Sequence, residues 1–371
     1  MGSRPVTDAE WDSLSPDFPN LDRSYTFWQA PETLSYNCIA WSMGITWTWI
    51  DPPSDQNSFT LLYKCLGFKP CAENLGTVDG YALNGEMTHA SCLLGTTWSS
   101  KLGEDFRISH PRVGLVGGIL YGDIVSHYCP ATTSWSLPKD LELEPASQEV
   151  VQQIATLADS IKTSYPELTN NFDTLYAAWK GTWFSTFNMA LQQSSAARAT
   201  GPQWEAVVAL GPTVLPLVVA KLTTGDDAFA VQLYNMLETD ATKRVDPDEL
   251  TTYYFLNNQA QADVTLFSSD VSAFNALADL WIQDQSHILR SSRSTDYLNH
   301  DSYNRLVRMG KSAIPLIMER YAWDQEGWWH ELMYEIVHQR RSGSMTFHKV
   351  DLFAYWKDWF QNPSVSQASS S

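Results

Sequence analysis

The chain has 371 residues, of which 44% are hydrophobic and 18% charged, so it can form about two domains and is not an intrinsically disordered protein by composition. The formal net charge of −18 argues against broad binding to nucleic acid or to an anionic membrane, because both require an extended basic surface. With 16 tryptophans, 16 tyrosines and 15 phenylalanines, the sequence predicts large aromatic cores.

The sequence shows no pattern of a secretion signal or a membrane span, which predicts a cytoplasmic location. The first residues lack the basic segment and apolar run of a signal peptide, and the most apolar stretch, residues 114–125, is too short to span a bilayer. An odd number of cysteines without a secretion signal favours free thiols over a disulfide framework. The five cysteines all lie in the first 130 residues: Cys38, Cys65, Cys71, Cys92 and Cys129. We therefore expect a soluble cytoplasmic protein without a membrane partner.

Residues 25–130 alternate short apolar runs with turn signals, a pattern typical of an α+β domain. Within this range, Thr88–Leu93 and Trp98–Lys101 are predicted strands, and residues 94–97 form the turn of a hairpin between them. A further strand is predicted over Gly118–Tyr128.

From about residue 147 the pattern becomes helical. Val150, Ile154, Leu157 and Ile161 recur at the spacing of one helix face, and similar faces continue to Phe360. The predicted organisation is an N-terminal arm (1–24), an α+β domain (25–130), a linker (131–146), an all-α domain (147–361) and a disordered tail (362–371).

The helical part contains an internal repeat. Residues 204–222 and 303–321 align on Pro216 and Pro315, and in each copy a glycine precedes an aliphatic-Pro-Leu-aliphatic segment. A helix that ends at glycine, followed by a helix with an early proline, predicts a tight helical hairpin. The pattern resembles degenerate HEAT-type repeats, which usually provide a scaffold or a surface for a protein partner.

A candidate nucleophile lies at the start of a short predicted helix. Asn37 is a good N-cap, Gly44 a good helix stop, and Cys38 falls in the first turn between them. Unpaired backbone N–H groups in a first turn stabilise a thiolate, which is one way of activating a cysteine. Cys38 could also be a small buried hydrophobic residue, and we interpret the other four cysteines in that way.

The predicted partner of Cys38 is His89, on the first strand of the hairpin. A histidine beside a cysteine at a helix start can act as base and then as acid in acyl transfer. A cysteine on a helix followed by a histidine on a strand is the order found in papain-like enzymes. The short distance between them in the sequence is similar to that in the compact NlpC-type cell-wall peptidases.

The residues around this pair carry a more specific resemblance. Asn37–Trp41 (NCIAW), Thr88–Ala90 (THA) and Trp98–Gly103 (WSSKLG) occur in the order seen in an uncharacterised family of mostly bacterial and fungal proteins. The resemblance covers roughly residues 25–130. It implies a papain-like Cys–His domain, here followed by an all-α, HEAT-like C-terminal domain, and it implies no particular substrate.

Such a site also needs a group that orients the histidine. Across the predicted hairpin from His89, Ser99 is our first candidate and Asp105 the next. Lys101 could lie close to the site or could be a structural ion-pair partner.

An oxyanion-binding group is also required. The backbone N–H of Cys38 would supply one donor, and the side chain of Asn37 or Gln29 could supply another, although Asn37 could be only the helix cap. Trp41, one helical turn after Cys38, could line the cleft.

The sequence contains no CxxC, HExxH, GxGxxG or GxxxxGK[ST] motif, so we expect no metal, nucleotide or other cofactor. The predicted function is acyl transfer from an amide or ester through a Cys38 thioester, with His89 as base and acid, in a hydrolase or an amide-forming acyltransferase. The substrate would be a peptide, an amino-acid derivative or a small amide or ester. An acyl-carrying RNA donor would require a local basic patch. The alternative is an inactive papain-like domain in an interaction protein whose helical repeats bind a partner.

Overall fold

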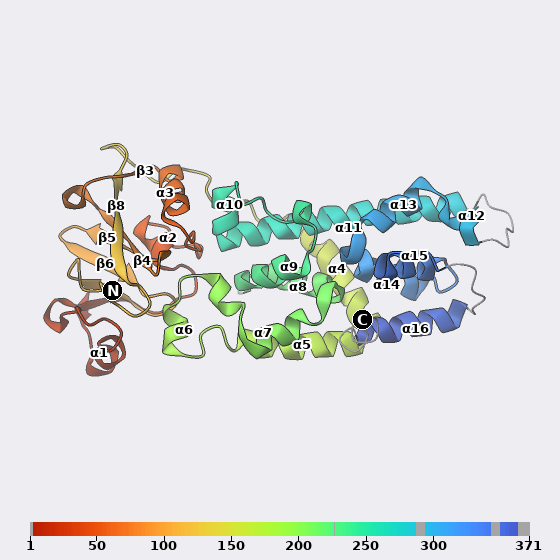
Figure 1. Cartoon of the computed structure of the whole chain (residues 1–371), viewed down its shortest axis with the longest axis horizontal. Coiled ribbons are helices and arrows are strands. Elements are labelled where there is room, and N and C mark those ends of the chain that lie inside the picture. The colour runs from red at the N-terminus through yellow and green to blue at the C-terminus, as the bar shows by residue number, and fades with distance from the viewer. Residues whose placement is uncertain (1–2, 226, 287–293, 343–348, 363–371) are drawn as a thin grey trace. The chain divides into compact units, whose positions relative to one another are not determined.

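The computed structural model describes residues 3–225, 227–286, 294–342 and 349–362 (Figure 1). The chain divides into two compact units, and neither unit is continuous in sequence. The first comprises Met1–Leu143, Gly181–Ala199 and Asp246–Gln259. Two segments from the part of the chain predicted to be helical therefore pack into the first unit, as does most of the predicted linker.

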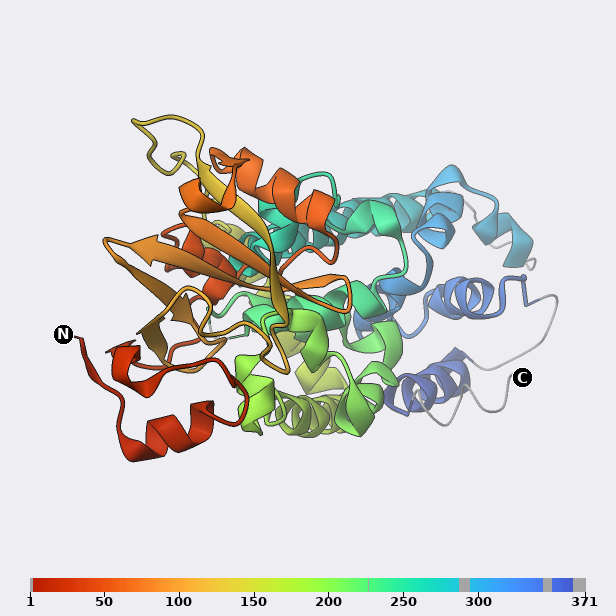
Figure 2. The same cartoon turned by 60° about the vertical axis from the view of Figure 1, so that its left-hand side comes forward.

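The first unit is built on one antiparallel sheet (Figures 1 and 2). Among the described residues eight strands form this sheet, in the order β1-β2-β7-β6-β5-β4-β8-β3. The strands are β1 Arg4–Pro5, β2 Phe27–Ala30, β3 Phe68–Pro70, β4 Val78–Leu83, β5 Glu86–Leu94, β6 Thr97–Lys101, β7 Arg107–His110 and β8 Asp123–Pro130. Its helices include α1 Asp8–Leu14, α2 Cys38–Ser42, α3 Gln56–Cys65, α6 Phe187–Leu191 and α10 Leu250–Tyr254. The predicted N-terminal arm thus supplies β1 and α1.

The predicted hairpin is confirmed. Strands β5 and β6 pair from Cys92–Ser99 to Leu94–Thr97, and Gly95 has a φ of 62° at the first central position of the turn, as type II′ turns require. The strand predicted over Gly118–Tyr128 begins only at Asp123, so its first part was wrong. Gly122 has a φ of 71°, and a Cβ at this position would collide with the carbonyl oxygen of Ala82.

Hydrophobic side chains of the first unit form two cores. One contains α2, α3 and Ala90 of β5, and the other contains Tyr81 of β4 together with Tyr121. Successive residues of a strand point to opposite faces of a sheet. Ala90 therefore packs toward α2, whereas the preceding residue, His89, packs against Tyr81 and Tyr121.

The second unit is helical, as the sequence predicts from residue 147 onward. Ser147 caps α4 through its side chain, and Ile154, Leu157 and Ile161 are buried as the spacing indicates. The helices are α4 Gln148–Ser164, α5 Pro166–Lys180, α7 Gly201–Val208, α8 Leu215–Leu222, α9 Val231–Leu237, most of α11 Leu256–Ser286, α12 Ser294–Leu298, α13 Asp301–Arg308, α14 Ile314–Trp323, α15 Trp329–His338 and α16 Lys349–Gln361 (Figure 1).

The two copies of the internal repeat fold alike. In each, a helix (α7 or α13) is followed by a 3-10 turn and a second helix (α8 or α14) with a proline in its first turn. Gly211 and Gly310 begin the turns with φ values of 64° and 70°, which glycine adopts most readily. The hairpin prediction is therefore confirmed in both copies.

In the described part of the chain, no single helix is both long and apolar enough to cross a membrane. The pair Gly201–Val208 and Gly211–Leu222 reaches that length only across a bend of 87°. Of the predicted disordered tail, residues 363–371 lie outside the described residues.

Candidate functional site

Cys38 is the first residue of α2 and is fully buried. The Asn37 side chain caps this helix by accepting from the Ala40 N–H at 3.2 Å, as predicted. Burial raises the pKa of the Cys38 thiol, while the backbone amides of Ala90 and Ile39 and the ammonium of Lys101 act in the opposite direction. At neutral pH Cys38 is therefore a protonated thiol.

His89 is fully buried and held through one ring nitrogen. Its Nε2 lies 3.0 Å from Oγ of Ser100, which in turn lies 2.9 Å from Nε2 of His110. Nδ1 of His89 has no hydrogen-bond partner among the described residues, so it forms no hydrogen bond with Cys38 either. Burial, as the main cause, and the nearby His110, as the second, hold the pKa of His89 well below its usual value. The ring is therefore neutral.

His89 lies on β5 beyond the last residue that pairs with β6, Cys92 opposite Ser99. The His89 ring stacks on Tyr121, with ring centres 3.9 Å apart and an interplanar angle of 9°. Cys38 itself belongs to the core that contains α2. Cys38 and His89 thus pack against different neighbours and form no direct hydrogen bond.

Ser99 does not contact His89, in contrast to our first choice of orienting residue. Its hydroxyl donates to Oε1 of Gln29 at 2.6 Å and accepts from Nε1 of Trp41 at 3.0 Å. Because side chains alternate along a strand, the next residue, Ser100, is the one that faces His89. The sequence argument identified the correct strand and the wrong face.

Lys101 and Asp105 form a loop-closing arrangement at the end of β6. The Lys101 ammonium is fully buried and donates to the backbone carbonyls of Gly103, Glu104 and Asp105 at 2.5–2.7 Å. Burial lowers the pKa of Lys101 to about 7. The Asp105 carboxylate accepts from the Phe106 N–H at 2.7 Å, so its hydrogen bond is local to the loop.

The two predicted oxyanion donors are engaged elsewhere. Nδ2 of Asn37 donates to the carbonyl of Ile50 at 2.7 Å and to that of Gln193 at 3.2 Å, which makes Asn37 a structural cap. Gln29 is bound to Ser99, as described above. Trp41 is half-buried beneath the Arg107 guanidinium, whose carbon lies 3.7 Å from the ring centre.

Gln193 was not found from the sequence, although it contacts Cys38 directly. Its Oε1 accepts from the Cys38 backbone N–H at 3.2 Å. The residue lies 155 positions further along the chain, in a segment without a motif, so no local signal could have indicated it.

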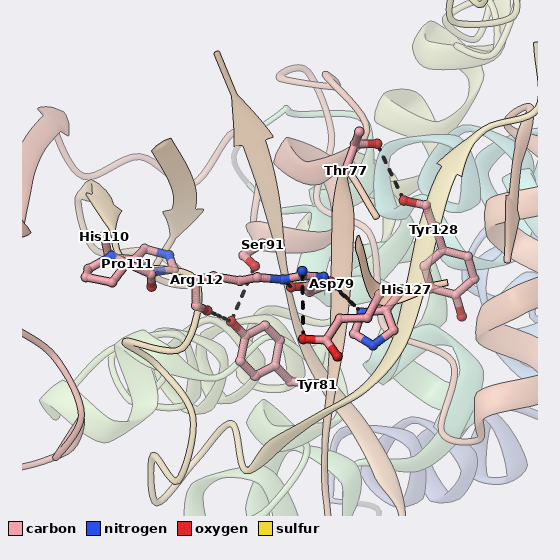
Figure 3. Close-up of polar contacts among 10 residues, drawn as sticks. Thr77, Asp79, Tyr81, Ser91, His110, Pro111, Arg112, His127 and Tyr128 are labelled. Carbon is pink, nitrogen blue, oxygen red and sulfur yellow. Dashed lines mark hydrogen bonds and ion pairs between the residues drawn. The ribbon is translucent and has the colours of Figure 1, made fainter. Parts of the chain in front are cut away.

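A second polar cluster lies on β4 and β8 (Figure 3). Buried Asp79 accepts two hydrogen bonds from Arg112, at 2.6 and 2.7 Å, and its Oδ1 lies 2.7 Å from Nδ1 of His127. Asp79 pairs with His127 in the ladder between the two strands. These contacts join β4, β8 and the turn after β7, which is the role of a structural ion pair.

Asp79→Asn is expected to lower the free energy of unfolding by about 2 kcal/mol, because a buried charged hydrogen-bond acceptor is lost while Arg112 can still reach water. The control is Glu73→Gln, since Glu73 also faces Arg112, at 3.9 Å, but is 73% exposed. Urea unfolding should detect less than about 0.5 kcal/mol for that control. Equal losses would contradict the structural role of Asp79.

Within the described residues, no group of three or more His, Cys, Asp or Glu side chains is arranged to hold a metal ion.

Comparison with known proteins adds a family match without an activity. No curated protein and no solved structure matches this chain. Residues 27–129 match the model of a domain of unknown function, DUF7689. The matched range includes Cys38, His89 and Ser100, and it ends before Gln193.

Proposed function

We propose that the first unit is a papain-like cysteine enzyme that transfers acyl groups from amides or esters. In this proposal Cys38 is the nucleophile, His89 the general base and acid, and Ser100 the residue that positions His89. The papain-like assignment is supported by a cysteine at the first position of α2 and a histidine on β5 of an antiparallel sheet.

The observation that carries the proposal is the state of the His89 ring. Ser100 holds Nε2 at 3.0 Å, while Nδ1 is buried and has no hydrogen-bond partner among the residues that the structure describes. A buried polar atom without a partner is costly to stability and is often retained for function. A neutral imidazole that is held through one nitrogen is suited to accept a thiol proton at the other nitrogen.

Each step of the reaction uses groups already described. In the proposed reaction the Cys38 sulfur and the His89 ring must first come within hydrogen-bond reach, since they form no hydrogen bond in this structure. His89 Nδ1 then takes the thiol proton as the sulfur attacks the carbonyl carbon, and the backbone N–H of Cys38 stabilises the oxyanion. The bond from the carbonyl carbon to the leaving nitrogen or oxygen then breaks, and His89 gives that atom its proton. Water, or an amine, attacks the thioester and restores the thiol. The substrate would be a peptide, an amino-acid derivative or a small amide or ester, acted on in the cytoplasm without a cofactor.

The test uses p-nitrophenyl acetate as the acyl donor and intact-mass and peptide mass spectrometry as the readout. We expect an acetyl group on Cys38, absent in Cys38→Ala, and formed about 10² to 10⁴ times more slowly in His89→Ala. Cys92→Ala is the matched control, because Cys92 is a second buried thiol of the same core, with a pKa raised to about 12 by burial.

Two results would contradict the proposal: acetylation of exposed Cys65 without acetylation of Cys38, or an unchanged Cys38 rate in His89→Ala.

An interaction protein is the second candidate, and the complete burial of Cys38 favours it. The helical unit also offers a cavity of about 550 Å³ between α4, α11 and α14, beside Trp323, which is 76% exposed. Exposed aromatic side chains beside a hollow are typical of protein-binding surfaces. The p-nitrophenyl acetate experiment separates the two candidates, because a scaffold requires no His89-dependent acetylation.

A further inference from the structure

The Gln193 side chain is buried against Cys38 and forms hydrogen bonds through both of its polar atoms. Only 2% of the residue is exposed. Its Oε1 accepts from the Cys38 N–H at 3.2 Å, and its Nε2 donates to Oη of Tyr121 at 3.2 Å and to the carbonyl of Leu191 at 2.6 Å. A complete carboxamide group is therefore recognised at this position.

The backbone of Gln193 is fixed as well. Its carbonyl oxygen accepts from Nε1 of Trp49 at 2.6 Å and from Nδ2 of Asn37 at 3.2 Å. Asn37 is also the cap of α2, so the same side chain holds both the cysteine helix and the segment that covers it. The contact belongs to the first unit, which includes Gly181–Ala199.

The carboxamide matches the geometry that acyl transfer requires. In a cysteine enzyme the backbone N–H of the nucleophile binds the carbonyl oxygen, and Oε1 of Gln193 occupies that donor. The nitrogen of the same carboxamide donates to Oη of Tyr121, and the Tyr121 ring stacks on His89. In the proposed reaction His89 is the residue that protonates the leaving nitrogen. Independently, Nδ1 of His89 is buried without a hydrogen-bond partner among the described residues, so it can accept a hydrogen bond from a polar ligand.

We infer that the Gln193 side chain stands in the position of the substrate's acyl group, and that the site acts on a glutamine-type carboxamide which displaces it. This inference rests on the proposed function of Cys38 and His89. An ester does not fit as well, because Tyr121 Oη accepts a hydrogen bond from an amide nitrogen and an ester oxygen has no hydrogen to donate.

The reaction is a deamidation. The Cys38 sulfur bonds to the carboxamide carbon, the carbon–nitrogen bond breaks, and the thiol proton leaves with the nitrogen as ammonia. Water then cleaves the thioester, which yields a carboxylic acid and the free thiol. In sum, one carboxamide and one water give one carboxylic acid and one ammonia, with no change of oxidation state.

Gln193→Ala tests the inference, with Gln192→Ala as the matched control. Gln192 is the same residue type in the same segment, and its side chain makes no hydrogen bond with the described residues. Ammonia release from N-acetylglutamine amide and acetylation of Cys38 by p-nitrophenyl acetate should both rise about 10-fold in Gln193→Ala, because the competing group is gone, and should stay at the wild-type level in Gln192→Ala.

The substrate class is tested by Tyr121→Phe in the Gln193→Ala background. Turnover of N-acetylglutamine amide should fall about 10-fold more than turnover of the γ-methyl ester of N-acetylglutamate, because only the amide donates to Tyr121. A wild-type mass lower by one ammonia would show that Cys38 has already attacked Gln193, and would also support the inference. Circular dichroism checks that each variant is folded.

Failure of this inference differs from failure of the proposed function. If p-nitrophenyl acetate acetylates Cys38 no faster in Gln193→Ala than in wild type, or if Tyr121→Phe lowers amide and ester turnover equally, Gln193 has only a structural role and the inference is overturned, while His89-dependent acetylation can still hold. If Cys38 reacts faster in Gln193→Ala but equally fast with and without His89, the proposed function is wrong, and with it the deamidation.

Discussion

Lys101→Met is expected to lower the free energy of unfolding by about 3 to 5 kcal/mol, because three backbone carbonyl groups lose one shared buried cationic donor at once. The ammonium donates to the carbonyl groups of Gly103, Glu104 and Asp105, which lie in the loop between β6 and β7. Methionine fills a similar volume and offers no hydrogen, so packing is preserved while the loop is left unsatisfied. Urea unfolding followed by near-ultraviolet circular dichroism measures the loss.

The matched control is Lys69→Met on β3, since Lys69 is exposed. We expect a change below about 0.5 kcal/mol there. A similar small change for Lys101→Met would mean that the carbonyl groups find water as readily as the ammonium, and that Lys101 does not hold the loop. The prediction also bears on the candidate site, because the Lys101 charge lowers the pKa of Cys38.

The second large effect is a loss of stability in acid that depends on His110. Burial lowers the pKa of His110 to about 4, although the Pro111 carbonyl and Asp79 act in the opposite direction. The unfolded chain, with an ordinary histidine pKa of about 6.5, therefore binds a proton between about pH 6.5 and pH 4 that the folded chain does not bind. Stability from this group is complete above about pH 6.5 and is lost as the pH falls toward 4.

His110→Asn removes this titration and keeps a donor for the Pro111 carbonyl, which lies 2.8 Å from Nδ1 of His110. Between about pH 7.5 and about pH 4.5, wild type should lose about 2.5 kcal/mol more of its unfolding free energy than the variant. The comparison cancels other groups such as Asp51, whose pKa burial raises to about 6 and whose contribution has the opposite sign. Parallel curves for the two proteins would show that His110 takes up its proton equally in both states.

Local sequence patterns determined those features that depend on neighbouring residues. Asn37 caps α2, Gly95 closes the β5–β6 hairpin, and the two glycine–proline repeats fold into similar helical hairpins, all as predicted. Each of these is a backbone preference expressed within a few residues, so it can be read without knowledge of the remaining chain.

The side of the sheet to which a strand residue points, and the hydrogen-bond partners of a buried group, could be determined only from the tertiary structure. Ser99 and Ser100 are chemically identical neighbours, and only the pairing of β6 with β7 and the position of α2 determine that Ser100 meets His89. The division of the chain into units also differs from the order of the sequence, because two later segments complete the first unit.

The sequence by itself thus predicted the helix on which Cys38 lies and the strand on which His89 lies. Only the tertiary structure decided what occupies the Cys38 N–H, because Gln193 reaches it from 155 residues away. A contact of that kind depends on how the chain closes a long loop and not on local propensity, so no spacing or motif can encode it visibly. The net negative charge is a property of the whole chain and has little bearing on the buried, neutral side chains of Cys38 and His89.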